Sequence, residues 1–165
     1  NPAPARNLPY DCFKNIDFFT PNETEASFFI NQSIESEKDC QSAAKVLLDK
    51  GVKNILITLG DKGCFFKNQE EEFLLPAKKF SVPVVDTTGA GDAFNGAFSV
   101  ALSKNKNYKE AIEFANLVAG ISVTREGAAN SMPTIDEIEE NLQWVIQRKK
   151  IDIKTCNTEI VGAVD

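Results

Sequence analysis

The sequence predicts an α/β layer fold with a largely parallel sheet. Two observations support this prediction: short apolar runs rich in β-branched residues alternate with stretches of helical period, and capping-box spacings precede several of those stretches. Of the 165 residues, 42% are hydrophobic and 25% are charged, which are ordinary values for a globular protein. The chain has the length and composition of one folded domain.

The first elements alternate between strand and helix. Residues 16–20 form a short apolar run before a proline, which indicates a buried strand. Asn22 and Glu25 have capping-box spacing, so we expect a helix over residues 23–30. A second capping box predicts a helix over residues 36–50, with a glycine directly after it.

The middle of the chain predicts strands joined by tight turns. Residues 54–59 (NILITL) are typical of a parallel core strand. Residues 60–63 contain two glycines and an aspartate, which favour a tight turn into residues 64–67. Residues 68–72 are a polar hairpin tip, and residues 73–75 form the returning strand.

The rest of the chain predicts one strand and three helices. Residues 80–86 read as a strand, and Pro83 favours an edge position or a bulge because proline has no amide to donate. The helical patterns cover residues 93–103, 108–124 and 135–148. Thr134 and Glu137 give the last helix a capping box. Residues 151–165 show little periodicity and are expected to be a tail.

Composition excludes several functional classes. A net charge of −6 argues against sequence-independent binding to nucleic acid or to an anionic membrane. With no histidine, the chain cannot form Ser-His or Cys-His nucleophile pairs or a His-ligated metal site. The cysteines show no C-x-x-C spacing: Cys12, Cys40, Cys64 and Cys156. No apolar run reaches membrane-spanning length and no signal peptide is seen, so we expect a cytoplasmic protein.

Asp86 to Gly96 (DTTGAGDAFNG) is the segment most informative about chemistry. A strand is expected to end at Asp86, and a helix to start near Asp92 after a glycine-containing loop. Bare backbone amides at a helix start bind anions, and a carboxylate there could accept a proton from an attacking hydroxyl. The alternative is that Asp92 only caps the helix. Phe94 replaces the third glycine of the dinucleotide fingerprint, and no Walker lysine follows.

Four segments together resemble the ribokinase-like sugar kinase family. They are DTTGAGDAFNGA (86–97), TPNETEA (20–26), ITLGDKG (57–63) and VTREGAANSMP (123–133), the last being most similar to the ribokinase branch. The resemblance implies a three-layer fold whose N-terminal half and β lid are absent from this sequence. Residues 1–150 are then the C-terminal nucleotide-binding and catalytic part. The start at Asn1, without a methionine, fits a fragment.

The resemblance implies roles for the glycine-containing loop and for the TPNETEA segment. Asp92 would be the base for the sugar hydroxyl, and Gly89, Ala90 and Gly91 would form the anion hole for the γ-phosphoryl. Asn22 would lie near the ATP phosphates, and Glu25 would hold Mg²⁺ through water. The alternative for Asn22 and Glu25 is a capping box with no ligand.

The resemblance also places the nucleotide and a monovalent cation. Residues similar to nucleotide contacts are Thr58, Gly60, Asp61, Lys62, Gly63 and Asn116, the last facing adenine. Alternatively, Lys62 points to solvent, residues 58–63 are a plain turn, and Asn116 faces solvent. Positions similar to a K⁺ site, mostly through backbone carbonyls, are Asp86, Thr88, Ser122, Arg125, Gly127 and Ser131. The alternative is that residues 125–127 are only the end of a helix, which the glycine terminates.

By this resemblance the expected reaction is transfer of the γ-phosphoryl of ATP to a sugar primary hydroxyl, with D-ribose giving ribose 5-phosphate. The expected ligands are ATP, Mg²⁺ and K⁺, and the expected assembly of a longer protein is a homodimer. Another sugar or nucleoside kinase of the family, a non-catalytic ATP-binding module and a dinucleotide-dependent oxidoreductase are the alternatives. Whether this chain turns over by itself is left open.

Overall fold

The computed structural model describes residues 1–78 and 82–141 of the chain. Its elements, in order, are α1 (Tyr10–Phe13), β1 (Phe18–Phe19), α2 (Glu23–Ile30), α3 (Glu37–Asp49), β2 (Asn54–Thr58), a 3₁₀ turn (Gly60–Lys62), β3 (Cys64–Lys67), β4 (Glu72–Leu75), α4 (Ala90–Ser103) and α5 (Tyr108–Ser122). A further helix follows over residues 135–141. The predicted tail and the end of the last predicted helix lie outside the described residues.

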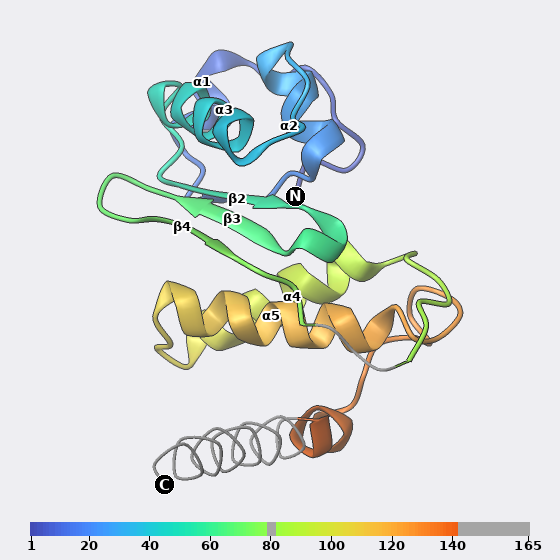
Figure 1. The fold of residues 1–165 in the computed structure, drawn as a ribbon. Helices are drawn as coiled ribbons and strands as arrows, with labels where there is room; N and C mark the ends of the chain where they lie inside the picture. The colour runs from blue at the N-terminus through green and yellow to red at the C-terminus, as the bar shows by residue number, and fades with distance from the viewer. Residues whose placement is uncertain (79–81, 142–165) are drawn as a thin grey trace, which may run out of the picture.

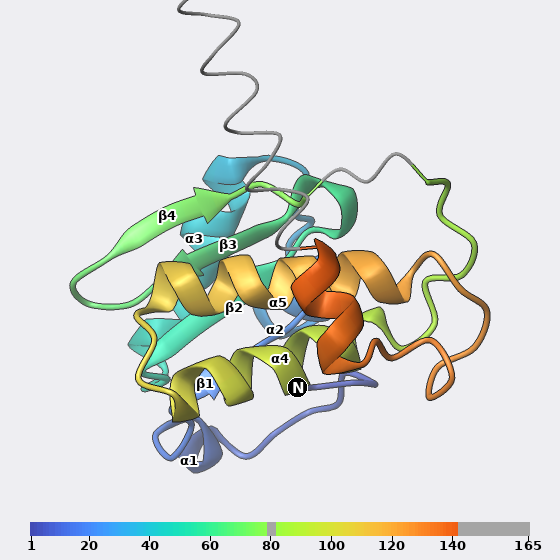
Figure 2. The same ribbon diagram turned by 90° about the horizontal axis from the view of Figure 1, so that it is seen from below.

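The described part of the molecule has three layers (Figure 1). Helices α1, α2 and α3 cover one face of the sheet, and α4 and α5 cover the other. Seen from the second direction, helix 135–141 crosses over α4 and α5 on the side away from the sheet (Figure 2). The predicted α/β layer architecture is confirmed.

Alternating side chains of the central strands enter two separate cores. Leu56 of β2 and Phe66 of β3 pack with α4 and α5. Ile55 and Ile57 of β2 and Phe65 of β3 pack with α2 and α3 on the opposite face. Because successive strand residues point to opposite faces, a nearly continuous apolar run is what a sheet covered on both faces requires.

The direction of strand pairing differs from the expectation. The strands lie in the order β1-β2-β3-β4, and only β1 with β2 is parallel among the described strands. β2 with β3 is antiparallel, and so is β3 with β4, which confirms the hairpin predicted over residues 64–75. The reason is the length of the connections, since short turns join antiparallel neighbours whereas parallel neighbours need a long crossover.

The strand predicted over residues 80–86 is wrong in its described part. Residues 82–86 do not join the sheet, and the amide of Val85 donates instead to the carbonyl of Val123, at 2.8 Å. Pro83 has no amide to contribute to a ladder. The segment therefore runs past the end of α5 and delivers Asp86 to the start of α4.

Helix starts follow their predicted caps closely. Both bonds of the capping box are present at Asn22 for α2 and at Ser36 for α3, and Thr134 with Glu137 opens helix 135–141 in the same way. The box at Asn107, which starts α5, was not predicted. Neither was the single turn of α1, whose start has no side-chain cap.

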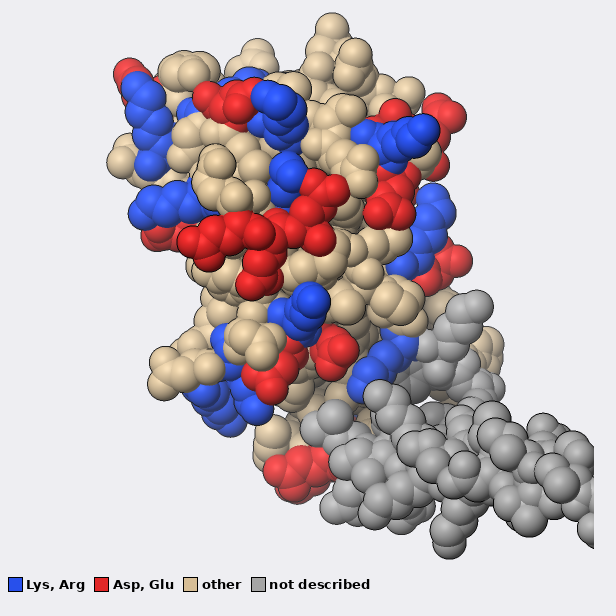
Figure 3. All heavy atoms as spheres, turned by 60° about the vertical axis from the view of Figure 1, so that its left-hand side comes forward, with Lys and Arg blue, Asp and Glu red and all other residues tan. Residues whose placement is uncertain are grey.

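Charged side chains of both signs are mixed over the face drawn in Figure 3, and acidic groups gather across its middle. Most ion pairs of the described residues are exposed, for example Lys45 with Asp49 on α3, and exposed pairs contribute little to stability. No helix of the described chain is long and apolar enough to cross a membrane. The two apolar cores are therefore the main source of stability.

Candidate active site

Helix α4 begins three residues earlier than predicted, at Ala90. Gly89 precedes it with a φ of 79°, a left-handed backbone that glycine adopts without strain. The Ala90 amide donates to the Thr87 carbonyl at 3.2 Å, so it is less free to bind a ligand than we expected. In the described chain the amides of Gly91 and Asp92 have no acceptor. These two N–H groups are the bare helix-start donors.

Asp92 lies on the outer side of the first turn of α4. It is exposed, and Gly89 rather than Asp92 occupies the cap position, where no side-chain cap bond is present. The capping alternative for Asp92 is therefore wrong. A carboxylate beside two bare amides at a helix start can approach the same ligand as those amides. The position is also accessible, because a Cβ added at Gly91 would meet no atom within 4 Å.

Asp86 connects two loops through its carboxylate. One oxygen accepts from the Thr88 amide at 2.8 Å, and the other accepts from the Gly127 amide at 2.9 Å. Hydrogen bonds from the Thr88 side chain, then from the Thr88 and Gly127 amides, hold the pKa of Asp86 below its ordinary value. The carboxylate is therefore ionised at neutral pH and fixes the turn that precedes α4.

The segment that follows α5 lies against the segment that precedes α4 (Figures 1 and 2). Besides the bond to Gly127, a Cβ added at Gly89 would come within 3.1 Å of Ala128. The Val123 carbonyl accepts from the amides of Val85 and Asp86. Two loops distant in sequence thus form one rim beside the bare amides.

A cavity of about 720 Å³ opens beside this rim, which is within the range of small-molecule sites. It is bounded by the start of α2, the end of β2, the segment before α4, and α5. Predicted site residues that line it are Asn22, Thr58, Gly60, Asp61, Gly63, Ala90, Gly91 and Asn116. Glu25, Lys62, Gly89, Asp92 and the six predicted cation residues are not among its lining residues.

Asn116 lines this cavity and carries an unsatisfied side-chain donor. The residue lies on α5, is only 8% exposed, and lines the cavity. Its Nδ2 is the only buried side-chain nitrogen or oxygen of the described residues with no hydrogen-bond partner. An unpaired buried amide costs about 1–3 kcal/mol, so Asn116 Nδ2 is a donor that a bound ligand or water would satisfy. The solvent-facing alternative for Asn116 is wrong.

The Asn22 segment forms a capping box and also borders the cavity. Asn22 Oδ1 accepts from the Glu25 amide at 2.8 Å, and Glu25 Oε2 accepts from the Asn22 amide at 2.9 Å. Glu25 is buried and does not line the cavity, but its carboxylate is hydrogen-bonded to the amide of the lining residue Asn22. A carboxylate in this place suits a Mg²⁺ ion that keeps several of its waters. The described residues contain no group of three or more acidic or cysteine side chains arranged to hold a metal ion.

The turn between β2 and β3 forms another wall of the cavity. Gly63 has a φ of 109°, and a Cβ there would lie 2.0 Å from the Leu75 carbonyl oxygen. Lys62 is exposed and pairs with Glu23 at 3.3 Å. It lies at the outer rim, neither lining the cavity nor pointing freely to solvent. The alternative that residues 58–63 form only a turn is incomplete, because Thr58, Gly60 and Asp61 line the cavity.

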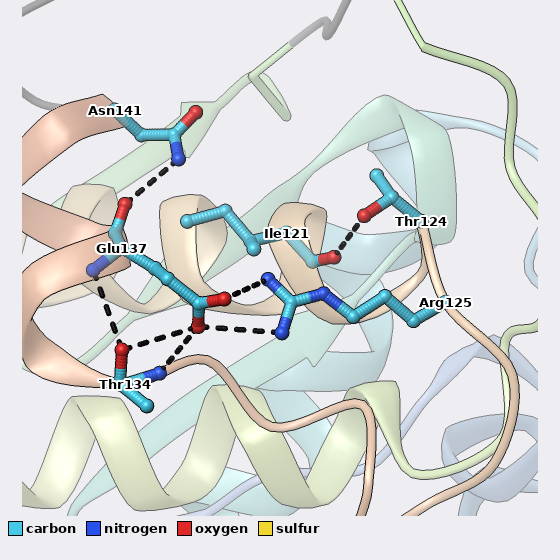
Figure 4. A network of polar contacts seen from close by, with 6 residues as sticks. All are labelled: Ile121, Thr124, Arg125, Thr134, Glu137 and Asn141. Atoms are coloured by element: carbon cyan, nitrogen blue, oxygen red, sulfur yellow. Dashed lines mark hydrogen bonds and ion pairs between the residues drawn. The ribbon is translucent and has the colours of Figure 1, made fainter.

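The predicted cation residues are only partly brought together. Asp86, Thr88 and Gly127 are linked by hydrogen bonds. The hydroxyls of Ser122 and Ser131 donate to carbonyls of their own segments. Figure 4 shows the Arg125 side chain directed toward Glu137. Backbone carbonyls, rather than these three side chains, are what the segment could offer an ion.

Several lining residues were not predicted from sequence. Most of them are apolar or small, among them Val82, Val84, Ala119, Gly120 and Val123. No local motif marks them, because they meet only when α5 packs beside the segment before α4. Helical spacing from Asn116 to Ala119, Gly120 and Val123 was the one available signal. With Phe94 they give one part of the cavity an apolar wall, which suits a planar base.

Comparison with known proteins identifies the family. Residues 1–135 match the family model for pfkB family carbohydrate kinases. The chain belongs to this family, which confirms the resemblance noted from the motifs.

The similar proteins include ribokinases and a deoxyribokinase. The chain is 43% identical over 143 residues to a ribokinase of Haemophilus influenzae, covering 87% of this chain and 46% of the relative. It is 39% identical over 143 residues to a deoxyribokinase of Salmonella typhi, with 86% and 46% covered. The structure of an Arabidopsis thaliana ribokinase complexed with ribose and ATP superimposes with a TM-score of 0.77 at 34% identity, over 81% of this chain and 43% of that one. The chain spans less than half the length of these proteins.

Proposed function

We propose that this chain is the nucleotide-binding and catalytic part of an ATP-dependent sugar kinase, with D-ribose as the acceptor. Family membership supports a carbohydrate kinase, and the ribokinase relatives support ribose. The Arabidopsis structure, which holds both ribose and ATP, is a neighbour of the same fold. The proposed product is ribose 5-phosphate.

One observation carries the proposal: a single cavity has a bare amide donor set at one wall and an unpaired buried amide at another. Gly91 lines it at the start of α4, and Asn116 lines it from the middle of α5. ATP has an anionic end that suits the Gly91 and Asp92 amides, and a base whose ring nitrogens can accept from Asn116 Nδ2. The apolar wall between them suits the base and ribose.

The chain's own residues would perform the transfer as follows. Asp92 accepts the proton of the sugar hydroxyl as that oxygen begins to bond phosphorus. The amides of Gly91 and Asp92 stabilise negative charge on the transferring group. Because phosphoryl transfer has a loose transition state, this positioning and electrostatic stabilisation contribute more than proton abstraction. Mg²⁺, when bound with ATP, neutralises phosphate charge, and Glu25 and Asn22 would hold it through water.

A K⁺ ion is the further proposed ligand. The Asp86 carboxylate would supply the anionic group, and carbonyls near Ser122, Arg125 and Ser131 would surround the ion. Carbonyl oxygens can replace the hydration shell of K⁺. We therefore expect higher turnover in KCl than in NaCl at equal ionic strength. Equal rates in the two salts would remove this part of the proposal.

Two measurements test the kinase proposal. Isothermal titration of the 165-residue chain with MgATP should show one site per chain. A chimaera, in which this chain replaces the matching segment of the Haemophilus influenzae ribokinase, should phosphorylate ribose in a coupled assay that detects ADP. A chain that binds ATP but gives an inactive, well-folded chimaera would support a non-catalytic ATP-binding module instead. A chain with no ATP affinity would overturn the proposal.

A further inference from the structure

Arg125 and Glu137 form an ion pair outside the cavity. Arg125 Nη2 lies 2.9 Å from Glu137 Oε1, and Nη1 donates to Glu137 Oε2 at 3.3 Å. Figure 4 shows the planar guanidinium facing the carboxylate with both nitrogens. Both side chains are only about one-third exposed, at 35% and 37%. Two-point pairing of this kind fixes orientation as well as distance.

Glu137 has a second function in the same network. Its Oε2 accepts from the Thr134 amide at 2.7 Å and from the Thr134 hydroxyl at 3.3 Å. The Thr134 amide, followed by the Arg125 side chain, lowers the pKa of Glu137 below its ordinary value. The same carboxylate therefore starts helix 135–141 and holds the residue that follows the end of α5.

The ion pair closes the loop of residues 126–133 into a fixed arch. At one end, the Thr124 hydroxyl donates to the Ile121 carbonyl at 2.7 Å. Within the arch, fully buried Ser131 donates to the Ala128 carbonyl at 2.8 Å. At the other end, Ile138 is buried in the core shared by α4 and α5. The arch is thus held at both ends and across its middle.

The arch in turn holds the backbone that precedes α4. Its Gly127 amide donates to Asp86 at 2.9 Å, and Ala128 lies so close to Gly89 that an added Cβ would approach it to 3.1 Å. Asp86 and Gly89 lie at the two ends of the turn that directly precedes the Gly91 and Asp92 amides. If the arch moves, its contacts with Asp86 and Gly89 therefore move the backbone that carries the bare amides of Gly91 and Asp92. The cavity residues need not move for this to happen.

We propose that Arg125 and Glu137 are positioning residues that set the geometry of the anion-binding amides at the start of α4. The inference rests on the proposed function, because it assigns those amides to the phosphates of ATP. Neither side chain touches the cavity, and the Arg125 guanidinium binds Glu137 rather than a ligand. Their effect is exerted on residues 86–92 through Gly127 and Ala128.

This role predicts an effect on one end of the ligand only. The opposite wall is built by Asn116 in the middle of α5 and by the end of β2, and among the described residues no hydrogen bond joins either of them to residues 126–133. Loss of the ion pair should weaken binding of the triphosphate and leave binding of adenosine unchanged. A general loosening of the fold would weaken both ligands together.

The experiment compares MgATP with adenosine by isothermal titration on the 165-residue chain. Glu137→Gln keeps an oxygen that can accept from the Thr134 amide but removes the charge, and Arg125→Lys keeps the charge but removes two-point pairing. Each should weaken MgATP roughly fivefold to tenfold, with adenosine affinity within twofold of the wild type. Asp86→Asn should show the same pattern. Asp49→Asn, which breaks the exposed pair with Lys45, is the matched control and should change neither affinity.

The amide proton of Gly127, followed by NMR, should shift in Glu137→Gln. Unchanged MgATP affinity, or parallel loss for both ligands, would overturn the inference while the kinase proposal stands. A wild-type chain that binds neither ligand would overturn the kinase proposal, and this inference with it.

Discussion

Asp92 is exposed at the start of α4, next to an amide donor that lines the cavity. Replacing its carboxylate by an amide, as in Asp92→Asn, removes the proton acceptor and keeps the size of the side chain. In the chimaera with the Haemophilus influenzae half, we expect turnover to fall about 10²- to 10⁴-fold, with the KM for ATP nearly unchanged. Steady-state kinetics in the coupled assay measure both quantities.

Glu113→Gln is a suitable control for that substitution, because Glu113 is an exposed carboxylate on α5 that does not line the cavity. It should leave turnover and the KM for ATP unchanged. If Asp92→Asn retained near-normal turnover, Asp92 could not be the base.

Asn116 gives a second prediction at this scale, with effects of opposite sign on stability and binding. Asn116→Leu removes the unpaired Nδ2 and fills a similar volume. Without ligand, the free energy of unfolding should rise by about 1 kcal/mol, because a buried unpaired amide is costly. ATP affinity should fall about tenfold, because the donor to the base is lost. Urea titration and calorimetry measure the two effects, and a variant with lower stability and normal ATP affinity would contradict this role.

Sequence reasoning identified the residues that carry distinctive local chemistry. Asp86, Gly91 and Asp92 stand in one continuous motif, so their proximity at the helix start needed no tertiary information. Val84 and Gly120 were not identified as site residues, because a valine in an extended segment and a glycine in a helix have no local signature. They become cavity residues only through the packing of α5 against the segment before α4.

At the scale of elements, the turn between β2 and β3 depends on one glycine. Gly63 has a φ of 109°, and the Leu75 carbonyl occupies the place of a Cβ. Gly63→Ala should therefore destabilise the fold by about 3 kcal/mol or more, through both a left-handed alanine and displacement of the end of β4. Gly60→Ala is the matched control, because its φ is 57° with no atom near a Cβ, and it should cost about 1 kcal/mol.

Thermal or urea unfolding of the two variants gives the comparison. The Gly63→Ala variant should also lose ATP affinity, since Ala77 and Lys78, which follow β4, line the cavity. If both variants lost the same free energy of unfolding, the clash between the added Cβ and the Leu75 carbonyl would contribute nothing to the destabilisation.

The pairing of two loops through Asp86 predicts a pH dependence. The pKa of Asp86 in the folded chain lies below its ordinary value, so its ionised form stabilises the fold. That contribution is fully present above the ordinary pKa of about 3.9 and is lost as the pH falls through the lower folded pKa. The melting temperature of the wild type should exceed that of Asp86→Asn at pH 6, and the difference should narrow below about pH 4. A difference that does not depend on pH would contradict this linkage.

Helices were predicted better than strand pairing, for a physical reason. A capping box such as Ser36 with Asp39 is closed within four residues, so the sequence contains the whole interaction. Pairing direction depends on what connects two strands and on which strands become neighbours. β2 and β3 are joined through a 3₁₀ turn, which leaves only the antiparallel arrangement. Residues 82–86 had the composition of a strand but bond to the end of α5 instead.

At the scale of the whole molecule, the three-layer arrangement follows from how β2 and β3 divide their side chains. Leu56 and Phe66 enter the core with α4 and α5, while Ile55, Ile57 and Phe65 enter the core with α2 and α3. Each buried apolar residue of the strands thus belongs to one of the two cores. The cavity lies where elements of both layers meet the sheet, with Asn22 from α2's cap on one side and Asn116 from α5 on the other. Neither core alone could build it.

The last prediction concerns which part of a family kinase selects the sugar and which part binds ATP. Over 143 residues the chain is 43% identical to a ribokinase and 39% identical to a deoxyribokinase, so sequence identity over this segment does not separate the two kinds of kinase. We expect a chimaera with the Haemophilus influenzae half to prefer ribose and one with the Salmonella typhi half to prefer deoxyribose. The KM for ATP should agree within about threefold in both, because the cavity proposed to bind the nucleotide comes from this chain. Coupled assays on both sugars measure the preference, and a preference for the same sugar in both chimaeras would place sugar selection in this chain instead.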